Sequence, residues 1–347
     1  MKKIFLLLIP FIFFACQNKD GQQAEINDVS INEIYQTERN EADNIDSPAF
    51  WSDGENNWVI ATAKSGNVLV VTKAEDGSFV KRVGSEGIEP GQFKRPNGIC
   101  VIDSLCIIVE RDNKRVQVLS LPEFKSLGFI SDSLLRKPYG LTTYKKDNVY
   151  NLYVTDNYET ADEQIPPPEQ LDKRIHYYTF TVSKNKLEWE LQNYFGSTKG
   201  EGVLSVVESI FADTLNNQLL LSEEDMNQSE VKVYNLQGQY MGKTFGAGYF
   251  TGQVEGIALW ENKDGSGYWI IADQSYEKNM FHVFKRKTLE YAGTFSGPKT
   301  TNTDGIWITG TSFGNFKSGA FFAVHNDGNV SAFDWSEIVS KLKLEVN

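Results

Sequence analysis

One short pattern recurs six times along this chain: a polar residue, a turn residue and then the start of an apolar run. The turn residues are Pro48, Gly98, Gly140, Ser209, Gly256 and Gly305, at spacings of 50, 42, 69, 47 and 49 residues. Repeats of about 40–50 residues are typical of β-propellers, in which each repeat is one blade around a channel. The sequence therefore predicts an all-β, six-bladed β-propeller over residues 41–340.

The polar member of each repeat is expected at one mouth of the channel, because it begins the innermost strand of its blade. Aromatic residues make up 13% of the chain, and such residues favour strands and pack well between twisted sheets. The expected ring consists of Ser47, Asn97, Tyr139, Glu208, Glu255 and Asp304.

Each apolar run returns through a turn and ends in polar residues, which indicates an antiparallel hairpin. The start of its first strand and the end of its second lie at the same edge, so a second polar ring is expected just outside the first. Lys64 and Arg111 belong to this second ring. The acidic residues expected on this face are Asp46, Glu208, Glu223, Glu224, Asp225, Glu255, Asp273, Asp304 and Asp327.

Clustered carboxylates raise one another's pKa or bind a cation. Oxygen donors of this kind suit calcium. The three histidines, His176, His282 and His325, are not spaced as a zinc ligand set. The alternative is that these residues are polar only because strand ends meet water.

The N-terminus has the pattern of a signal peptide over residues 1–15: a basic start, an apolar stretch and Ala15 before Cys16. Cys16 lies where a bacterial lipobox has its lipidated cysteine, so we expect lipidation of Cys16 and a polar tether over residues 16–40. The expected location is the bacterial cell envelope, anchored by lipid to the outer membrane on its periplasmic or surface side. The alternative is plain secretion, with Cys16 incidental.

Without the signal peptide the formal charge falls from −12 to −14, because Lys2 and Lys3 are lost. This balance disfavours nucleic acid or an anionic membrane surface as a partner and suits a cation. Contact with a membrane is expected only through the lipid, and we expect a monomer. Cys100 and Cys106 flank a short turn, and two buried thiols or a disulfide across the hairpin both remain open.

Several segments resemble the β-propeller phytases, which are secreted calcium-dependent phosphatases with six blades. The segments are Asp46-Ser47-Pro48-Ala49-Phe50-Trp51, Ser222-Glu223-Glu224-Asp225, Val254-Glu255-Gly256-Ile257, Ala272-Asp273-Gln274-Ser275 and Thr303-Asp304-Gly305-Ile306. They occur in the family's order over residues 41–340. The resemblance implies calcium ligands at Asp46, Glu208, Glu224, Glu255, Gln274 and Asp304. It also implies that Lys64, Arg111 and Tyr139 hold the substrate phosphate and act in catalysis.

The chain departs from the family pattern at several positions. Ser47 and Gln253 stand where the family has aspartate, and a lysine expected after Val154-Thr155 is missing. Fewer ligands imply fewer or weaker calcium sites. A long insertion, residues 157–173, is expected either as a lid or as a plain surface loop, and Lys173 or Arg174 is a candidate to replace the missing lysine.

The function implied by the resemblance is hydrolysis of phosphate from inositol hexaphosphate, or a related phosphate-rich small molecule, by a metal-activated water. A second resemblance points to another class of protein. Residues 91–99 and 111–118 are similar to one NHL repeat, and NHL repeats build binding propellers without catalysis. The alternative function is therefore a lipid-anchored propeller that binds a peptide or glycan at its central mouth.

Overall fold

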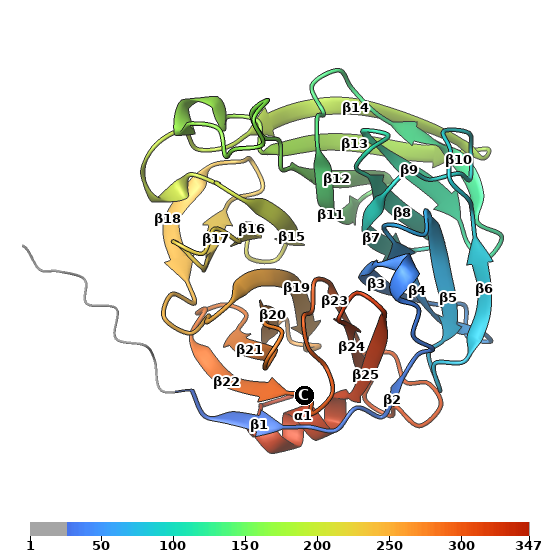
Figure 1. The fold of residues 1–347 in the computed structure, drawn as a ribbon, viewed down its shortest axis with the longest axis vertical. Helices are drawn as coiled ribbons and strands as arrows, with labels where there is room; N and C mark the ends of the chain where they lie inside the picture. Colours follow the sequence, from blue (N-terminus) through green and yellow to red (C-terminus); the bar gives the residue numbers. More distant parts are fainter. Residues whose placement is uncertain (1–25, 347) are drawn as a thin grey trace, which may run out of the picture.

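The computed structural model describes residues 26–346 and shows six sheets arranged as blades around a central channel (Figure 1). The predicted all-β, six-bladed propeller is confirmed. Helical structure in these residues comprises α1 (Trp335–Leu342) and the short 3-10 turns η1 (Glu41–Asp43), η2 (Pro168–Gln170) and η3 (Gly200–Gly202). The signal peptide and Cys16 lie outside the described residues.

In five blades, four strands follow one another in the chain from the channel outward, and the fifth of these blades has β1 as an additional outer strand. Blade one has β3 (Ile45–Ser52), β4 (Asn57–Ala63), β5 (Val68–Lys73) and β6 (Phe79–Val83), and blade two has β7 (Pro96–Ile102), β8 (Leu105–Glu110), β9 (Arg115–Ser120) and β10 (Lys125–Ile130). Blade three has β11 (Pro138–Lys146), β12 (Val149–Asp156), β13 (Ile175–Ser183) and β14 (Lys186–Phe195), and blade four has β15 (Val207–Asp213), β16 (Gln218–Glu223), β17 (Glu230–Tyr234) and β18 (Tyr240–Phe245). Blade five has β19 (Gln253–Glu261), β20 (Gly267–Gln274), β21 (Met280–Lys285) and β22 (Tyr291–Ser296), and blade six contributes β23 (Ile306–Thr309), β24 (Ala320–His325) and β25 (Asn329–Asp334).

The two N-terminal strands complete the last two blades. β2 (Tyr35–Gln36) pairs antiparallel with β25 as the fourth strand of blade six, and β1 (Asp28–Ser30) pairs in parallel with β22 (Figure 1). The expected boundary at residue 41 is therefore too late, and residues 28–36 are part of the propeller rather than of a tether. Strands this short carry no alternation of apolar and polar residues from which the sequence could reveal them.

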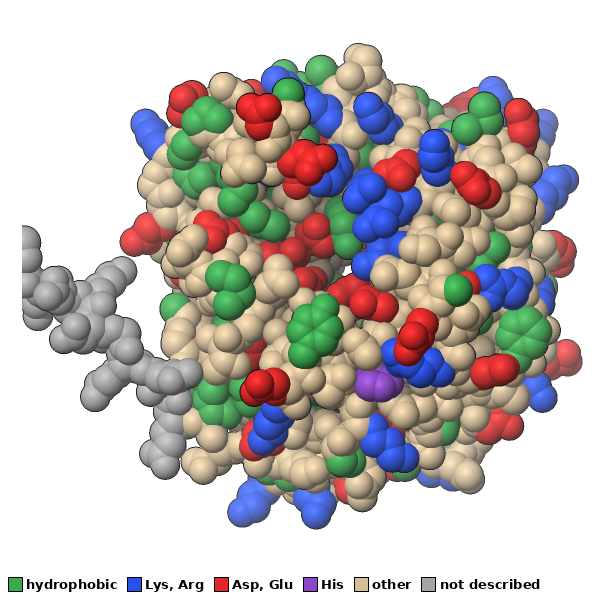
Figure 2. Space-filling view, in the orientation of Figure 1, with side chains coloured by type: hydrophobic (Ala, Val, Ile, Leu, Met, Phe, Trp, Pro, Cys, Tyr) green, Lys and Arg blue, Asp and Glu red, His purple; other side chains and the backbone are tan. Residues whose placement is uncertain are grey.

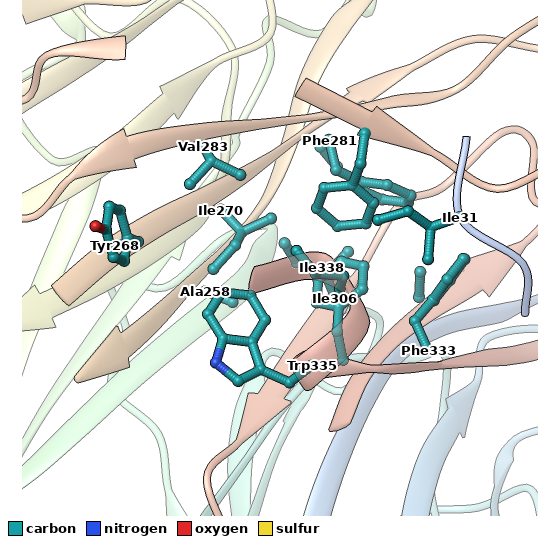
Figure 3. Close-up of a cluster of buried hydrophobic side chains, with 14 of the residues drawn as sticks. Ile31, Ala258, Tyr268, Ile270, Phe281, Val283, Ile306, Phe333, Trp335 and Ile338 are labelled. Atoms are coloured by element: carbon teal, nitrogen blue, oxygen red, sulfur yellow. The ribbon is translucent and has the colours of Figure 1, made fainter. Parts of the chain in front are cut away.

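The core lies between neighbouring blades. The second strand of each blade is therefore covered on both faces by the adjacent blades. In β16 every residue is buried, which explains why such strands are continuous apolar runs in the sequence. Figure 3 shows the cluster between blades five and six, where Phe281 and Phe333 meet Trp335 and Ile338 of α1. Asp334 caps this helix by accepting a hydrogen bond from the Ser336 amide at 2.9 Å, so α1 begins where β25 ends.

The channel below the predicted mouth is a cavity of about 270 Å³ with largely apolar walls that include Ile99, Leu141 and Ile257. Cys100 also lines it, and both Cys100 and Cys106 are free thiols, which excludes the disulfide. Within residues 26–346, no helix has the length and hydropathy that crossing a membrane requires.

Candidate metal centre

The polar ring forms because the innermost strands are irregular where they begin. The pairing of β3, β7, β11, β15 and β19 with the next strand shifts register at the ring residue, for example between Val207 and Ile210 and between Val254 and Ile257. Such a bulge bends the strand and redirects a side chain. At these bulges the side chains of Glu208 and Glu255 no longer follow the in-and-out alternation of the strand and point toward the mouth.

The mouth encloses a small cavity of about 30 Å³, which is enough for one or two particles of the size of water. Figure 2 shows acidic side chains inside the central hollow on this face. The side chains and turn residues around the cavity, which together with Lys64 and Glu224 we call the acidic mouth, are Asp46, Ser47, Gly98, Tyr139, Gly140, Glu208, Ser209, Glu255 and Asp304.

Three glutamates from two blades converge here. Glu208, Glu224 and Glu255 each offer a carboxylate oxygen, and these oxygens lie within 4.8 Å of one another. Glu224 is buried, and its Oε1 has no hydrogen-bond partner in the described part of the chain. A buried, unpartnered carboxylate oxygen is costly unless a cation or proton accompanies it. The donor set therefore fits a hard divalent cation such as calcium.

Lys64 compensates the charge on the other side of the mouth. Its Nζ lies 2.9 Å from Asp46 Oδ1 and 2.8 Å from Asp304 Oδ2. Tyr139 donates a hydrogen bond from its hydroxyl to Asp46 Oδ1 at 3.2 Å, and Gln274 donates from its amide to Asp304 Oδ1. Asp46 and Asp304 are therefore already paired with a cation of the protein, whereas no basic side chain within residues 26–346 forms an ion pair with any of the three glutamates.

Burial is the main cause of the shifted pKa values in the mouth. Burial, followed by the charge of Asp46, raises the pKa of Glu208 to about 7. Burial and Asp46 raise the pKa of Asp304 to about 6, although Lys64 acts in the opposite direction. Burial and the neighbouring carboxylates hold the pKa of Glu224 and of Glu255 well above the usual range. Without a cation, burial and mutual repulsion therefore favour the protonated form of these glutamates.

Burial opposes the charge on Lys64, but Asp46 and Asp304 outweigh it, so the pKa of Lys64 rises above its ordinary value. Lys64 therefore stays charged across the physiological pH range. Burial and the surrounding carboxylates likewise raise the pKa of Tyr139, which keeps its hydroxyl protonated as a donor.

The second polar ring divides into two sets because successive strand residues point to opposite sides. Glu223 accepts hydrogen bonds from the Ser205 and Val206 amides at 2.7 and 2.9 Å. Asp273 does the same for Thr251 and Gly252, at 2.9 and 2.7 Å. Glu223 and Asp273 of this ring do not join the mouth, because their carboxylates fix the turns that precede the ring. The next residues, Glu224 and Gln274, reach the mouth instead.

Arg111 was expected at the acidic mouth but does not lie there. Its Nε lies 2.8 Å from Asp112 Oδ1, and its side chain lines a different cavity of about 410 Å³ that shares no wall residue with the mouth. Arg111 follows β8 at the register position that Lys64 has after β4, but the neighbouring Asp112 holds the guanidinium aside.

Asn157, which the sequence did not single out as a site residue, belongs to this region. Asn157 donates from Nδ2 to Glu208 Oε1 at 3.1 Å, and its register position after Asp156 matches that of Glu224 after Glu223. Asn97 of the expected ring is fully buried, and neither its amide oxygen nor its amide nitrogen has a partner within residues 26–346.

Arg174 does not replace the missing lysine. It is buried, and its guanidinium donates to the carbonyls of Leu204, Asp156, Tyr158 and Ser205. It therefore ties the insertion to blade four instead of contacting the mouth. Lys173 lies 3.4 Å from Asp172 and over the ring of Tyr194, which gives it partners outside the mouth.

One family model matches part of this chain. Residues 176–340 match the family model described as Phytase. The resemblance to the phytase family is confirmed over these residues. The matched range is a little under half of the chain and contains five of the six expected ligands, Glu208, Glu224, Glu255, Gln274 and Asp304. It supports a phytase-like hydrolase in general.

No curated protein matches the chain. Among solved structures, the crystal structure of BBS1N in complex with ARL6DN, soaked with mercury, matches with a TM-score of 0.49 and 9% identity. The match covers 88% of this chain and 97% of that chain.

Proposed function

We propose that this phytase-like hydrolase is a calcium-dependent phosphomonoesterase that releases phosphate from inositol hexaphosphate or a related phosphate-rich small molecule. The observation that carries the proposal is the convergence of Glu208, Glu224 and Glu255 within 4.8 Å, with one buried oxygen unpartnered. The Phytase match includes all three residues. These three glutamates would hold the cation.

A bound divalent cation would neutralise phosphate charge and lower the pKa of water in the mouth. The protein's own groups act by positioning. Tyr139 keeps its proton and lines the cavity, so its hydroxyl would turn from Asp46 to a phosphate oxygen when substrate binds. Lys64 has three N–H donors, of which Asp46 and Asp304 accept two, and the third would go to the substrate. Asn157 keeps Glu208 oriented by its hydrogen bond.

The expected setting is the cell envelope, with the protein held by lipid on Cys16 and acting as a monomer. A phosphate-rich substrate suits such a site only when a cation offsets the acidic residues, since the mouth itself is acidic. Calcium dependence is therefore the feature that separates this proposal from a binding propeller for peptide or glycan.

The test is phosphate release from inositol hexaphosphate by the purified protein, in calcium and in excess chelator. We expect release with calcium and its loss with chelator. Glu255→Gln, which conserves shape in the mouth, should lower the rate at least about 100-fold, on the scale of removing one electrostatic catalytic group. Glu188→Gln is the matched control, because the Glu188 side chain is 68% exposed on β14 and has no role in the proposed site. Equal rates with and without chelator would refute the proposal.

A further inference from the structure

A second cavity of about 410 Å³ lies on the side of blades two and three and is lined mainly by cations. Its walls carry five basic and two acidic side chains in a protein whose net charge is −12. Figure 2 shows a group of Lys and Arg side chains at the rim of the central hollow. We call this cavity the basic pocket, and its walls are Lys94, Arg111, Asp112, Lys114, Arg136, Lys137, Tyr158, Glu159 and Thr160.

The two acids of the basic pocket are already paired. Arg111 lies 2.8 Å from Asp112, and Lys137 lies 2.7 Å from Glu159. Among the ion pairs of residues 26–346, none joins Lys94, Lys114 or Arg136 to a carboxylate. Three positive charges therefore remain uncompensated around one cavity. Such an arrangement costs free energy through mutual repulsion unless an anion binds.

Buried carboxylates hold the backbone of this pocket in place. Glu110 accepts a hydrogen bond from the Lys94 amide at 3.2 Å, and the buried Arg115 pairs with Glu110 at 2.7 Å. Asp156 accepts from the amides of Arg136 and Lys137 at 2.9 and 2.6 Å. The cationic side chains thus project from fixed turns, which reduces the entropy lost when a ligand binds.

Tyr158 of the insertion fixes one of the cations. The Arg136 guanidinium lies 4.4 Å from the centre of its ring, and the buried Arg174 lies 4.6 Å from it. The Tyr158 hydroxyl donates to the Gln170 carbonyl at 2.5 Å, so the ring is held from its far end. A guanidinium stacked in this way keeps its planar N–H donors free for an oxyanion.

We propose that the basic pocket binds an oxyanion of the phosphate or sulfate class without any divalent cation. Its ligands would be Lys94, Lys114 and Arg136, with Arg111 and Lys137 beside them. Arg and Lys side chains bind phosphate oxygens through charge-assisted hydrogen bonds. The inference is independent of the proposed phosphatase activity, because it needs neither the acidic mouth nor a metal.

The test is calorimetric titration of the full protein in excess chelator, with inorganic phosphate in one arm and inositol hexaphosphate in the other. We expect binding that weakens as salt rises. Similar affinities in both arms identify a single oxyanion as the ligand, whereas at least tenfold tighter binding of inositol hexaphosphate identifies a phosphate group on a larger molecule. Absence of binding in both arms overturns the proposal.

Variants locate the site. Lys94→Gln/Lys114→Gln should raise the dissociation constant at least tenfold, and Arg136→Gln should do so independently. The matched control is Lys243→Gln/Lys287→Gln, which removes two exposed lysines from β18 and from the turn after β21. Glu255→Gln should leave this affinity unchanged, which separates failure here from failure of the proposed activity. Equal affinity in all these variants would place the anion elsewhere and overturn the proposal.

Discussion

Lys64 Nζ lies 2.8 Å from Asp304 Oδ2, which joins the first blade to the sixth across the acidic mouth. The same ammonium lies 2.9 Å from Asp46 Oδ1. Both contacts are shielded, since the Lys64 side chain is only 8% exposed. A single ammonium group thus links the first and last blades and is the cationic partner of two carboxylates in the mouth.

Replacing Lys64 by Met should destabilise the protein by about 3–5 kcal/mol, because Asp46 and Asp304 would remain buried without their partner. The measurement is the free energy of unfolding by urea, in chelator and then in calcium. Calcium should recover part of the loss if it can approach these carboxylates. The control is Lys285→Gln, which breaks an exposed pair with Glu290 and should cost far less stability. Equal losses in the two variants would contradict this role of Lys64.

The raised pKa values predict how stability depends on pH when no cation is bound. The pKa of Glu208 rises to about 7 and that of Asp304 to about 6, so their contribution to stability is fully present below the unfolded pKa values and is lost as pH rises through 6 and 7. In chelator, unfolding at pH 5 should therefore require more urea than at pH 8. Each pKa unit corresponds to about 1.4 kcal/mol.

Glu208→Gln isolates this effect from other titrating groups, because it removes one of the shifted carboxylates. The difference in unfolding free energy between pH 5 and pH 8 should shrink in the variant. Calcium should also reduce the difference in the wild-type protein, since a cation competes with protons for the same oxygens. An unchanged pH dependence in the variant would show that Glu208 is not the titrating group.

Two adjacent glutamates offer a matched comparison. Glu223→Gln replaces one of the carboxylate oxygens that accept the Ser205 and Val206 amides, so it should cost about 1–3 kcal/mol of stability. Glu224→Gln should preserve or raise the stability measured in chelator, because the amide stays uncharged beside Glu208 and Glu255 without binding a proton or a cation. Thermal unfolding of both variants in chelator and in calcium measures this. Similar behaviour of the two variants would contradict a structural role for Glu223 and a cation-binding role for Glu224.

The blades and the ring were predictable from the sequence because both repeat. Glu208, Glu255 and Asp304 share one position relative to a turn residue and an apolar run, and the structure places all three around one cavity. The choice between Glu223 and Glu224 was not predictable in the same way, because side-chain direction depends on strand register at the bulge. As a result, Glu223 holds a turn in place, whereas its neighbour Glu224 faces the other glutamates of the mouth.

Arg111 shows a second reason why the sequence did not predict the whole site. Its register position matches that of Lys64, yet the local pair with Asp112 draws its guanidinium into the basic pocket. Strands β1 and β2 escaped prediction because three and two residues carry no periodic signal. Contacts between side chains decide such cases, and a repeat pattern does not encode them.

Calcium titration by calorimetry tests most directly whether Glu208, Glu224 and Glu255 form a divalent-cation site. We expect the wild-type protein to bind calcium, and Glu188→Gln to bind it equally well. Glu224→Gln and Glu255→Gln should each weaken binding at least tenfold, which corresponds to about 1.4 kcal/mol. No calcium binding by the wild-type protein, or full binding by both variants, would contradict the account.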